Sequence, residues 1–364
     1  MTDPRVGEYA RLLVDRSVAV EPRWQVVISA QVAARPLVEE VQRQIARRGA
    51  WAITQLAWEG SGGAWTREAP DELLAEPAPL LELVQGQADA FISIAAPENV
   101  RDVADLPPGR IASVQAANAT LRRRTLAMEV PWVVCQYPTN ALAQEAGMAL
   151  PQFEDFLYGA CLLDWDAEEE KLRRIADRLE RSSEVRLVAE GTDLRLTVAG
   201  RSPQVDDGHI NMPGGEVFVS PVEDATEGLV TFSEFPATYF GHEVGGAWLR
   251  FAGGRVVDAG AATGEAHLLA MLDTDPGARV LGELGLGCNP GITRHLKNTL
   301  FDEKINGTVH LALGRSYAST GGTNHSLIHW DLVKDLRRGG QLYFDGELVQ
   351  ASGEWADSLA VTGL

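Results

Sequence analysis

Cysteine is scarce in this chain of 364 residues. Its three cysteines, at positions 135, 161 and 288, are widely spaced and form no CxxC pair. An odd and sparse set of this kind supports neither a disulfide framework nor a cysteine-rich zinc site. The first residues are polar and lack the apolar run of a signal peptide. We therefore expect a cytoplasmic protein whose thiols are reduced.

Positive charge and long apolar runs are also in short supply. The chain has 32 Lys and Arg against 51 Asp and Glu, which gives a formal net charge of −19. So acidic a chain repels phosphate groups, which argues against general binding to nucleic acid or to an anionic membrane surface. No run of about 18 apolar residues occurs, so we expect no membrane-spanning helix. A hydrophobic content of 45% excludes disorder of the whole chain.

The first half of the chain alternates short apolar runs with amphipathic stretches. The runs expected to form strands are 25–30, 51–57, 90–95 and 132–137. The stretches expected to form helices are 36–48, 71–84 and 111–128. This alternation is typical of βαβ units and predicts an α/β domain with a parallel sheet. No GxGxxG motif follows any of these strands, so a dinucleotide site has no support.

A charged stretch over residues 152–181 predicts one long helix that connects two domains. We place the boundary near its end, with an N-terminal α/β domain over 1–182 and a C-terminal catalytic, metal-binding domain over 183–364. Beyond the boundary, apolar residues alternate around glycine-containing turns, which predicts hairpins at 185–198, 248–257 and 341–349. The second half is therefore expected to be α+β, with a mixed or antiparallel sheet.

Histidine is absent from the first half of the chain. All seven histidines lie between residues 209 and 329. Metal or acid–base chemistry is therefore expected in the second half.

Five residues of the second half have side chains that suit metal binding. Glu283 lies in the apolar run ARVLGELGLG, where a carboxylate must be solvated at a strand end, paired, or bound to a cation. His310 in GTVHLALG is either a hydrogen-bonded core residue or a ligand. His329 and Asp331 share a face if IHWD is extended, so they form either a metal site or a hydrogen-bonded pair. Glu216 follows the glycine turn of MPGGEVF and is either a ligand or part of an acidic surface loop.

Together these residues suit a hydrolytic site with two metal ions, which needs a bridging carboxylate and terminal ligands for each ion. Three carboxylates and a hydroxide nearly balance the charge of two divalent ions. Tyr317, in the loop segment RSYASTGG, either faces such a site or serves in packing.

Several segments in order resemble the thermophilic metalloaminopeptidase family of aminopeptidases T, S and II. They are TDLRLTV, DDGHINMPGGEVFVSP, GELGLGCNPGI, FDEKINGTVHLALGRSY, GGTNHSLIHWD and GELVQASG. The resemblance is strong over about residues 185–353. It is weaker over the first half, where WVVCQYP at 132–138 is similar to a family segment. Cys288 departs from the family pattern, in which threonine is common; its thiol is either a passive small residue or a site of oxidation.

The resemblance implies a dinuclear aminopeptidase that releases N-terminal amino acids from small peptides. It implies two divalent ions per chain, Co²⁺, Zn²⁺ or Mg²⁺, and a homodimer. Matched by motif, Glu283 is the bridging ligand and Tyr317 lies beside the ions. The implied metal ligands are Glu216, Glu283, His310, His329 and Asp331.

The sequence leaves open which residue accepts the proton and which class of reaction the protein catalyses. The catalytic base is Glu303, Glu283 or Glu216. A ring-cleaving dioxygenase of the dihydroxypyridine type, with one Fe(II), is the main rival function, since such enzymes resemble the same family. The third possible function is that of a relative that binds peptides or metal ions without catalytic activity.

Overall fold

The structure, a computed structural model, describes residues 3–239 and 241–359. The chain forms two compact units, one of residues 1–162 with 208–214 and one of residues 163–207 with 215–364. The units change at Leu162, whereas the domain boundary predicted at residue 182 lies at the far end of the next helix. That boundary stays a prediction. Among the described residues, no helix has the length and apolar character needed to cross a bilayer.

The first unit is built on a parallel sheet, as predicted. Its order is β2-β1-β3-β4-β8, and each neighbouring pair runs parallel. The strands are β1 (Gln25–Gln31), β2 (Trp51–Ala57), β3 (Ala90–Ala95), β4 (Trp132–Gln136) and β8 (Asn211–Met212). The helices are α1 (Pro4–Leu12), α2 (Arg35–Arg47), α3 (Ser61–Glu68), α4 (Asp71–Leu74), α5 (Pro79–Gln87), α6 (Pro108–Leu121), α7 (Arg123–Leu126), α8 (Asn140–Glu145) and α9 (Leu150–Cys161).

Two helices predicted as continuous are broken, and those predictions were wrong. The stretch 71–84 forms α4 and α5, because Pro77 and Pro79 cannot continue a helix. The stretch 152–181 forms α9 and α10 (Trp165–Glu180). Asp164 separates them, since its side chain accepts a hydrogen bond from the Ala167 N–H (3.3 Å) and caps the start of α10.

The second unit holds two larger antiparallel sheets. The eight-stranded one has the order β14-β13-β10-β6-β5-β18-β19-β20. Its strands are β5 (Glu184–Ala189), β6 (Thr192–Thr197), β10 (Glu227–Phe232), β13 (Ala247–Ala252), β14 (Arg255–Gly260), β18 (Gln341–Phe344), β19 (Glu347–Ala351) and β20 (Glu354–Trp355). The pairs β5–β6, β13–β14 and β18–β19 confirm the three predicted hairpins.

The five-stranded sheet carries the candidate site. Its order is β17-β16-β15-β9-β7, with all neighbours antiparallel. Its strands are β7 (Gln204–Asp206), β9 (Glu216–Val219), β15 (Leu281–Gly287), β16 (Thr308–Gly314) and β17 (His329–Asp335). The unit also contains β11 (Ala237–Tyr239), β12 (His242–Val244), α11 (Glu265–Leu272) and the short helix α12 (Thr299–Asp302).

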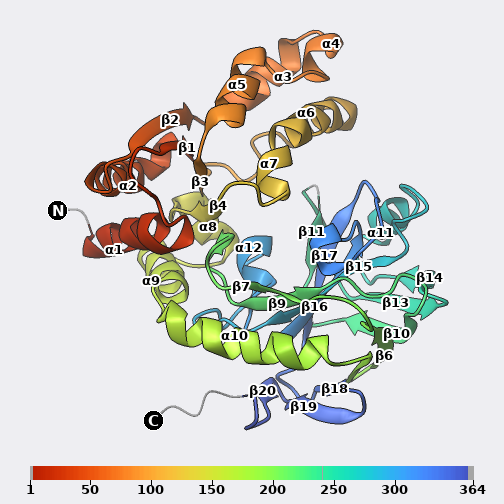
Figure 1. Cartoon of the computed structure of the whole chain (residues 1–364). Coiled ribbons are helices and arrows are strands. Elements are labelled where there is room, and N and C mark those ends of the chain that lie inside the picture. The colour runs from red at the N-terminus through yellow and green to blue at the C-terminus, as the bar shows by residue number, and fades with distance from the viewer. Residues whose placement is uncertain (1–2, 240, 360–364) are drawn as a thin grey trace. The chain divides into compact units, whose positions relative to one another are not determined.

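Helix α10 and this sheet share one hydrophobic core. Leu172, Ile175 and Leu179 of α10 are fully buried and belong to the same cluster as Leu284 and Leu311 of the sheet. Figure 1 shows α10 running along the β7 and β9 side of the unit. Because side chains alternate along a strand, the residues next to these leucines point to the opposite face, where the candidate site lies.

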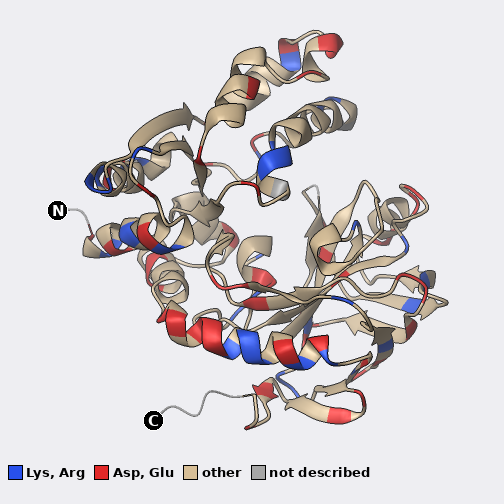
Figure 2. Cartoon of the chain, in the orientation of Figure 1, with Lys and Arg blue, Asp and Glu red and all other residues tan. Residues whose placement is uncertain are grey.

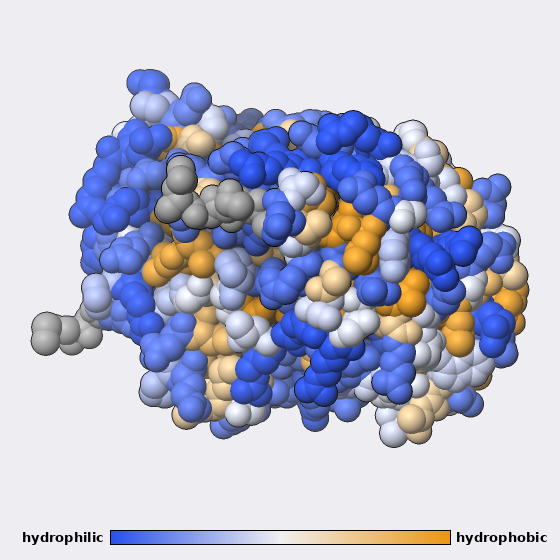
Figure 3. All heavy atoms as spheres, turned by 90° about the horizontal axis from the view of Figure 1, so that it is seen from below, coloured by the Kyte–Doolittle hydropathy of each residue, from blue (hydrophilic) through white to orange (hydrophobic). Residues whose placement is uncertain are grey.

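Charged and hydrophilic residues are frequent on the surface shown in the figures. Figure 2 shows red and blue segments alternating along α10, where Arg173 and Arg174 pair with Glu169 and Glu170 one turn away. On the face in Figure 3, hydrophobic residues lie in small groups between hydrophilic ones. This surface agrees with the acidic composition of the chain.

Candidate metal centre

Strand β15 has an alternating sequence that clears space on one face of the sheet. Leu284 and Leu286 point into the core, so Glu283, Gly285 and Gly287 share the other face. Gly285 is paired with His310 of β16, and a Cβ added at Gly285 would lie 1.9 Å from His310 Cε1. The glycine therefore leaves room for the imidazole ring. In the GELGLG motif, the leucines thus fill the core, and Gly285 and Gly287 leave space on the face that carries Glu283.

The structure brings the five predicted ligand side chains together on this face, from four neighbouring strands. Glu283 lies at the centre. Its Oε1 is 3.3 Å from His310 Nε2, and its Oε2 is 3.2 Å from His329 Nε2. Glu216 Oε2 lies 3.6 Å from His310 Nε2, and Asp331 Oδ1 lies 3.8 Å from His329 Nε2. The side chains form two possible metal-holding groups, Glu216–Glu283–His310 and Glu283–His329–Asp331, which share Glu283.

Both imidazoles are oriented by backbone carbonyl groups. His310 Nδ1 is 2.9 Å from the carbonyl oxygen of Glu303, and His329 Nδ1 is 2.7 Å from that of Arg315. A carbonyl only accepts, so each Nδ1 carries the proton and each Nε2 is left for the cluster. Metal-binding histidines are commonly held in this way.

The electrostatics of the cluster are those of charged groups held close together. Burial raises the pKa of Glu283, but hydrogen bonds from His310 and His329 outweigh it and lower that pKa to about 2. Burial lowers the pKa of both histidines, but the neighbouring carboxylates raise it to about 10 for His310 and about 9 for His329. Two positively charged imidazoles therefore lie against the Glu283 carboxylate, and a divalent ion bound to their nitrogens would have to displace a proton from each.

The donor atoms fit divalent metal ions. Among the described residues, Glu216 Oε2 and Asp331 Oδ1 are buried oxygens without a hydrogen-bond partner. A buried oxygen without a partner lowers the stability of the folded protein unless a hydrogen-bond donor or a cation lies against it. Both belong to the two groups named above, and a mixed set of carboxylates and imidazoles suits Zn²⁺, Co²⁺ or Mn²⁺.

Tyr317 lies at the edge of the cluster. Its hydroxyl is 3.5 Å from His329 Nε2, and its ring packs edge-on against Phe218 at 5.5 Å between centroids. Desolvation, followed by the charges of Glu283 and Asp331, raises the pKa of Tyr317 above its usual value. The phenol is therefore a neutral hydrogen-bond donor beside the cluster.

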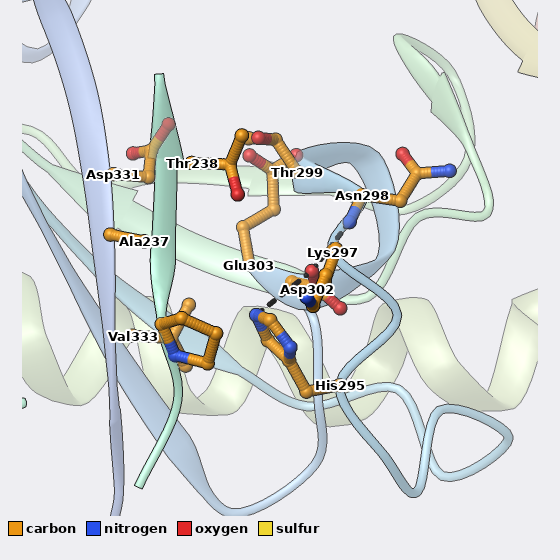
Figure 4. A pocket seen from close by; sticks show the side chains of 11 residues that line it. Ala237, Thr238, His295, Lys297, Asn298, Thr299, Asp302, Glu303, Asp331 and Val333 are labelled. Atoms are coloured by element: carbon orange, nitrogen blue, oxygen red, sulfur yellow. Dashed lines mark hydrogen bonds and ion pairs between the residues drawn. The ribbon is translucent and has the colours of Figure 1, made fainter. Parts of the chain in front are cut away.

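Glu303 lies beside the cluster rather than in it. A pocket next to the metal-holding groups is lined by Glu303 and Asp331, together with Thr238, His295 and other residues (Figure 4). The Glu303 carboxylate contacts Lys304 Nζ. The other two candidates for the base, Glu216 and Glu283, direct oxygens at the histidines of the cluster.

Two residues that support the candidate site, Lys304 and Gly285, were not predicted from the sequence. Lys304 is fully buried and lies between Glu216, Glu303 and Asp206. Its local signal was weak, since the acidic residues before it in FDEKIN suggest a surface turn. Gly285 could have been found from the alternation of glycine and leucine.

Cys288 belongs to the hydrophobic core of the second unit. It is fully buried, and burial raises the pKa of its thiol to about 12. Because the thiolate is the reactive form, this environment argues against ready oxidation.

Comparisons with known proteins agree with the geometry. The family model described as thermophilic metalloprotease (M29) matches residues 2–355. Aminopeptidase 2 of Geobacillus stearothermophilus is 30% identical, over 98% of this chain and 99% of that protein. Aminopeptidase T of Thermus aquaticus is 28% identical, over 90% of this chain and 91% of that protein.

Two solved structures share the fold over nearly the whole chain. AmpT of Thermus thermophilus superposes with a TM-score of 0.85 at 24% identity, covering 97% of this chain and 99% of that one. The 2,5-dihydroxypyridine dioxygenase of Pseudomonas putida KT2440 superposes with a TM-score of 0.62 at 12% identity, covering 98% of both chains. The family resemblance and the α/β fold class predicted from the sequence are thus confirmed. Because the family model matches residues 2–355 of its 364 residues, the chain belongs to the thermophilic metalloprotease family M29.

Proposed function

We propose that this protein is an aminopeptidase that uses two divalent metal ions to release N-terminal amino acids from small peptides. The observation that carries the proposal is the position of Glu283. Its two oxygens lie 3.3 and 3.2 Å from the Nε2 atoms of two different histidines, so each oxygen would be available to a different ion. Membership of a metallopeptidase family and the similarity to aminopeptidases support the same reaction class.

The proposed ligands fall into two sets that share the bridging carboxylate. Glu216 and His310 would hold one ion, and His329 and Asp331 would hold the other. Cobalt, zinc and magnesium are the candidates for the bound metal. When bound, such a pair of ions polarises a carbonyl group and makes a water molecule acidic enough to ionise near neutral pH.

The remaining chemistry falls to side chains outside the ligand set. Tyr317 carries a neutral phenol next to His329, so it donates a hydrogen bond to the oxygen that becomes negative during peptide cleavage. Glu303 is the base that we favour, because it lines the pocket next to Asp331 and lies outside both metal-holding groups. It accepts a proton from the attacking water and returns it to the leaving amine.

The alternative of a ring-cleaving dioxygenase has weaker support. Its solved relative is 12% identical, which shows a common fold and no more. An Fe(II) oxygenase would use one ion with open positions for oxygen and substrate. The presence of two ligand groups on one face of the sheet favours the peptidase. It also disfavours a relative that binds metal or peptide without catalysis.

We also propose that the protein is a cytoplasmic homodimer, as the family resemblance implies. Its three cysteines are buried thiols, which agrees with a reducing compartment. In the first unit, Trp58, Trp65 and Leu80 are more than half exposed, and we choose Trp65 to test for a contact between copies. Light scattering should give the mass of a dimer, and Trp65→Glu should lower it towards that of one chain. A wild-type protein with the mass of one chain at micromolar concentration would contradict the dimer.

The function can be tested with a panel of aminoacyl p-nitroanilides. The protein is stripped with a chelator and then supplied separately with Co²⁺, Zn²⁺, Mn²⁺, Mg²⁺ or Fe²⁺. We expect p-nitroaniline release that is absent from the stripped protein and returns with Co²⁺ or Zn²⁺. Ring cleavage of a dihydroxypyridine with Fe²⁺ and oxygen, in a protein that releases no p-nitroaniline with any metal, would favour the dioxygenase.

A further inference from the structure

Lys304 is a fully buried lysine surrounded by more negative charge than its own charge requires. Its Nζ lies 3.2 Å from Glu216 Oε1 and 3.6 Å from Asp206 Oδ2, and it also contacts the carboxylate of Glu303. Lys334, which is equally buried in the same unit, pairs with the single carboxylate of Glu234 at 2.8 Å. Among the described residues, Lys334 is thus kept buried by one carboxylate together with the hydroxyl of Thr231, which lies 3.4 Å from its Nζ. The extra partners of Lys304 call for another explanation.

The two oxygens of Glu216 have different surroundings. Oε1 is paired with Lys304, whereas Oε2 lies 3.6 Å from His310 Nε2 and, among the described residues, accepts no hydrogen bond. An ammonium group that occupies one oxygen turns the other towards the cluster. Glu216 is thereby presented as a ligand through a single oxygen.

The backbone around Lys304 is fixed to the segment that carries Glu216. The Lys304 carbonyl accepts a hydrogen bond from the Asn289 N–H at 3.0 Å. Gly215, with φ of +109°, packs so closely on Asn289 that an added Cβ would lie 2.6 Å from the Asn289 Cβ. The Cys288 N–H also donates to the Gly215 carbonyl at 2.8 Å. The start of β9 and residue 304 are therefore held in one arrangement.

Two consecutive residues thus orient two ligands of the same group. The Glu303 carbonyl holds His310 Nδ1, and the Lys304 ammonium holds Glu216. The other group is oriented from a different segment, since the Arg315 carbonyl holds His329 Nδ1. Each group of ligands is therefore oriented by a different segment of the chain.

We propose that Lys304 is a positioning residue for one half of the metal centre: it fixes Glu216 as a single-oxygen ligand in the Glu216–Glu283–His310 group. This inference rests on the proposed two-ion function. Loss of a group that orients a metal ligand typically lowers metal affinity about 10–100-fold. The loss of Lys304 should affect one ion and spare the ion held by His329 and Asp331.

The test compares the wild type with Lys304→Met, and uses Lys334→Met as the matched control. Zn²⁺ bound per chain is measured by mass spectrometry after dialysis against buffered free zinc, and Co²⁺ titrations are followed by the visible absorption of the bound ion. We expect two ions in the wild type and in the control. In Lys304→Met, one ion should bind as in the wild type and the other about 10–100-fold more weakly. Its weak site should show an altered cobalt spectrum, which Lys304→Arg should partly restore.

Other results would overturn the proposal. Removing a positive charge beside a cation site favours cation binding by Coulomb's law. If Lys304→Met binds both ions as tightly as the wild type, or more tightly, the positioning role is wrong. Equal weakening of both ions in a folded variant also contradicts it. A wild type that binds a single ion instead contradicts the two-ion function itself.

A second measurement covers the case in which Lys304→Met does not fold. A crystal structure of the zinc-loaded wild type should show zinc on Glu216 Oε2 alone, with Oε1 still on Lys304 Nζ. Glu216 bound to zinc through both oxygens, or a Lys304 that has turned away, would refute the inference.

Discussion

Replacing Gly285 by alanine places a methyl group where the His310 ring lies. The added Cβ would be 1.9 Å from Cε1 and 2.0 Å from Nε2 of that ring. Carbon atoms in favourable contact are about 3.5–4.0 Å apart, so the ring or the strand must move by roughly 1.5–2 Å. Ligands of a functional site need to be placed within about 0.5 Å. The displacement is therefore several times larger than the centre tolerates.

The expected result is a folded protein with a damaged metal centre. Overpacking a well-packed region costs about 1–3 kcal/mol, which a stable domain survives. The ion held by Glu216 and His310 should bind at least about 10-fold more weakly, and misplacement by more than about 1 Å should lower turnover on the order of 100-fold. Zinc per chain, p-nitroanilide cleavage and urea unfolding are measured on one preparation.

Gly159→Ala is the control, because no atom lies within 4 Å of a Cβ added at that helical position. It should leave metal content and activity unchanged. Wild-type zinc affinity and wild-type turnover in Gly285→Ala would show that the His310 ring is not a ligand in the position described.

Two further predictions concern Tyr317 and Asp275. Tyr317→Phe should retain both ions and lower kcat by about 10²–10³, since it removes one hydrogen-bond donor to the developing oxyanion; loss of metal from this variant would contradict the separation of roles. Asp275 accepts hydrogen bonds from Ser326 Oγ (2.9 Å) and the Leu327 N–H (2.8 Å), and although burial raises its pKa, these bonds lower it below 3.8. Its contribution is therefore present above the unfolded pKa and is lost as the pH falls through the folded value. Asp275→Asn should destabilise the protein by roughly 1 kcal/mol at pH 7 in urea unfolding and by less near pH 3, whereas an equal loss at both pH values would contradict this sign.

Much of the fold could be predicted from local pattern. The four strands predicted for the first unit are present in the structure. Short runs of β-branched and apolar residues that are bounded by turns favour strands over other secondary structure. Helix ends were harder to predict. The break at Asp164 depends on a single capping bond, and the break before α5 on prolines within an otherwise helical period.

The candidate site was predicted residue by residue but not as a geometry. His329 and Asp331 share a face of β17 because they are two residues apart, which the sequence shows directly. The division of the Glu283 oxygens between two histidines depends on the register of β15, β16 and β17, which no local pattern fixes. The role of Lys304 was not predicted for the same reason, because its partners Asp206 and Glu216 are distant in sequence.

We propose that this centre works with two ions bridged by Glu283. The most direct test is a titration of metal-free protein with Co²⁺ or Zn²⁺, in which bound metal and p-nitroanilide cleavage are measured at each added equivalent. Activity should rise to its full value only as the second equivalent binds, and Glu283→Gln should abolish both metal binding and cleavage. Full activity at one equivalent, or a Glu283→Gln variant that retains two tightly bound ions, would contradict it.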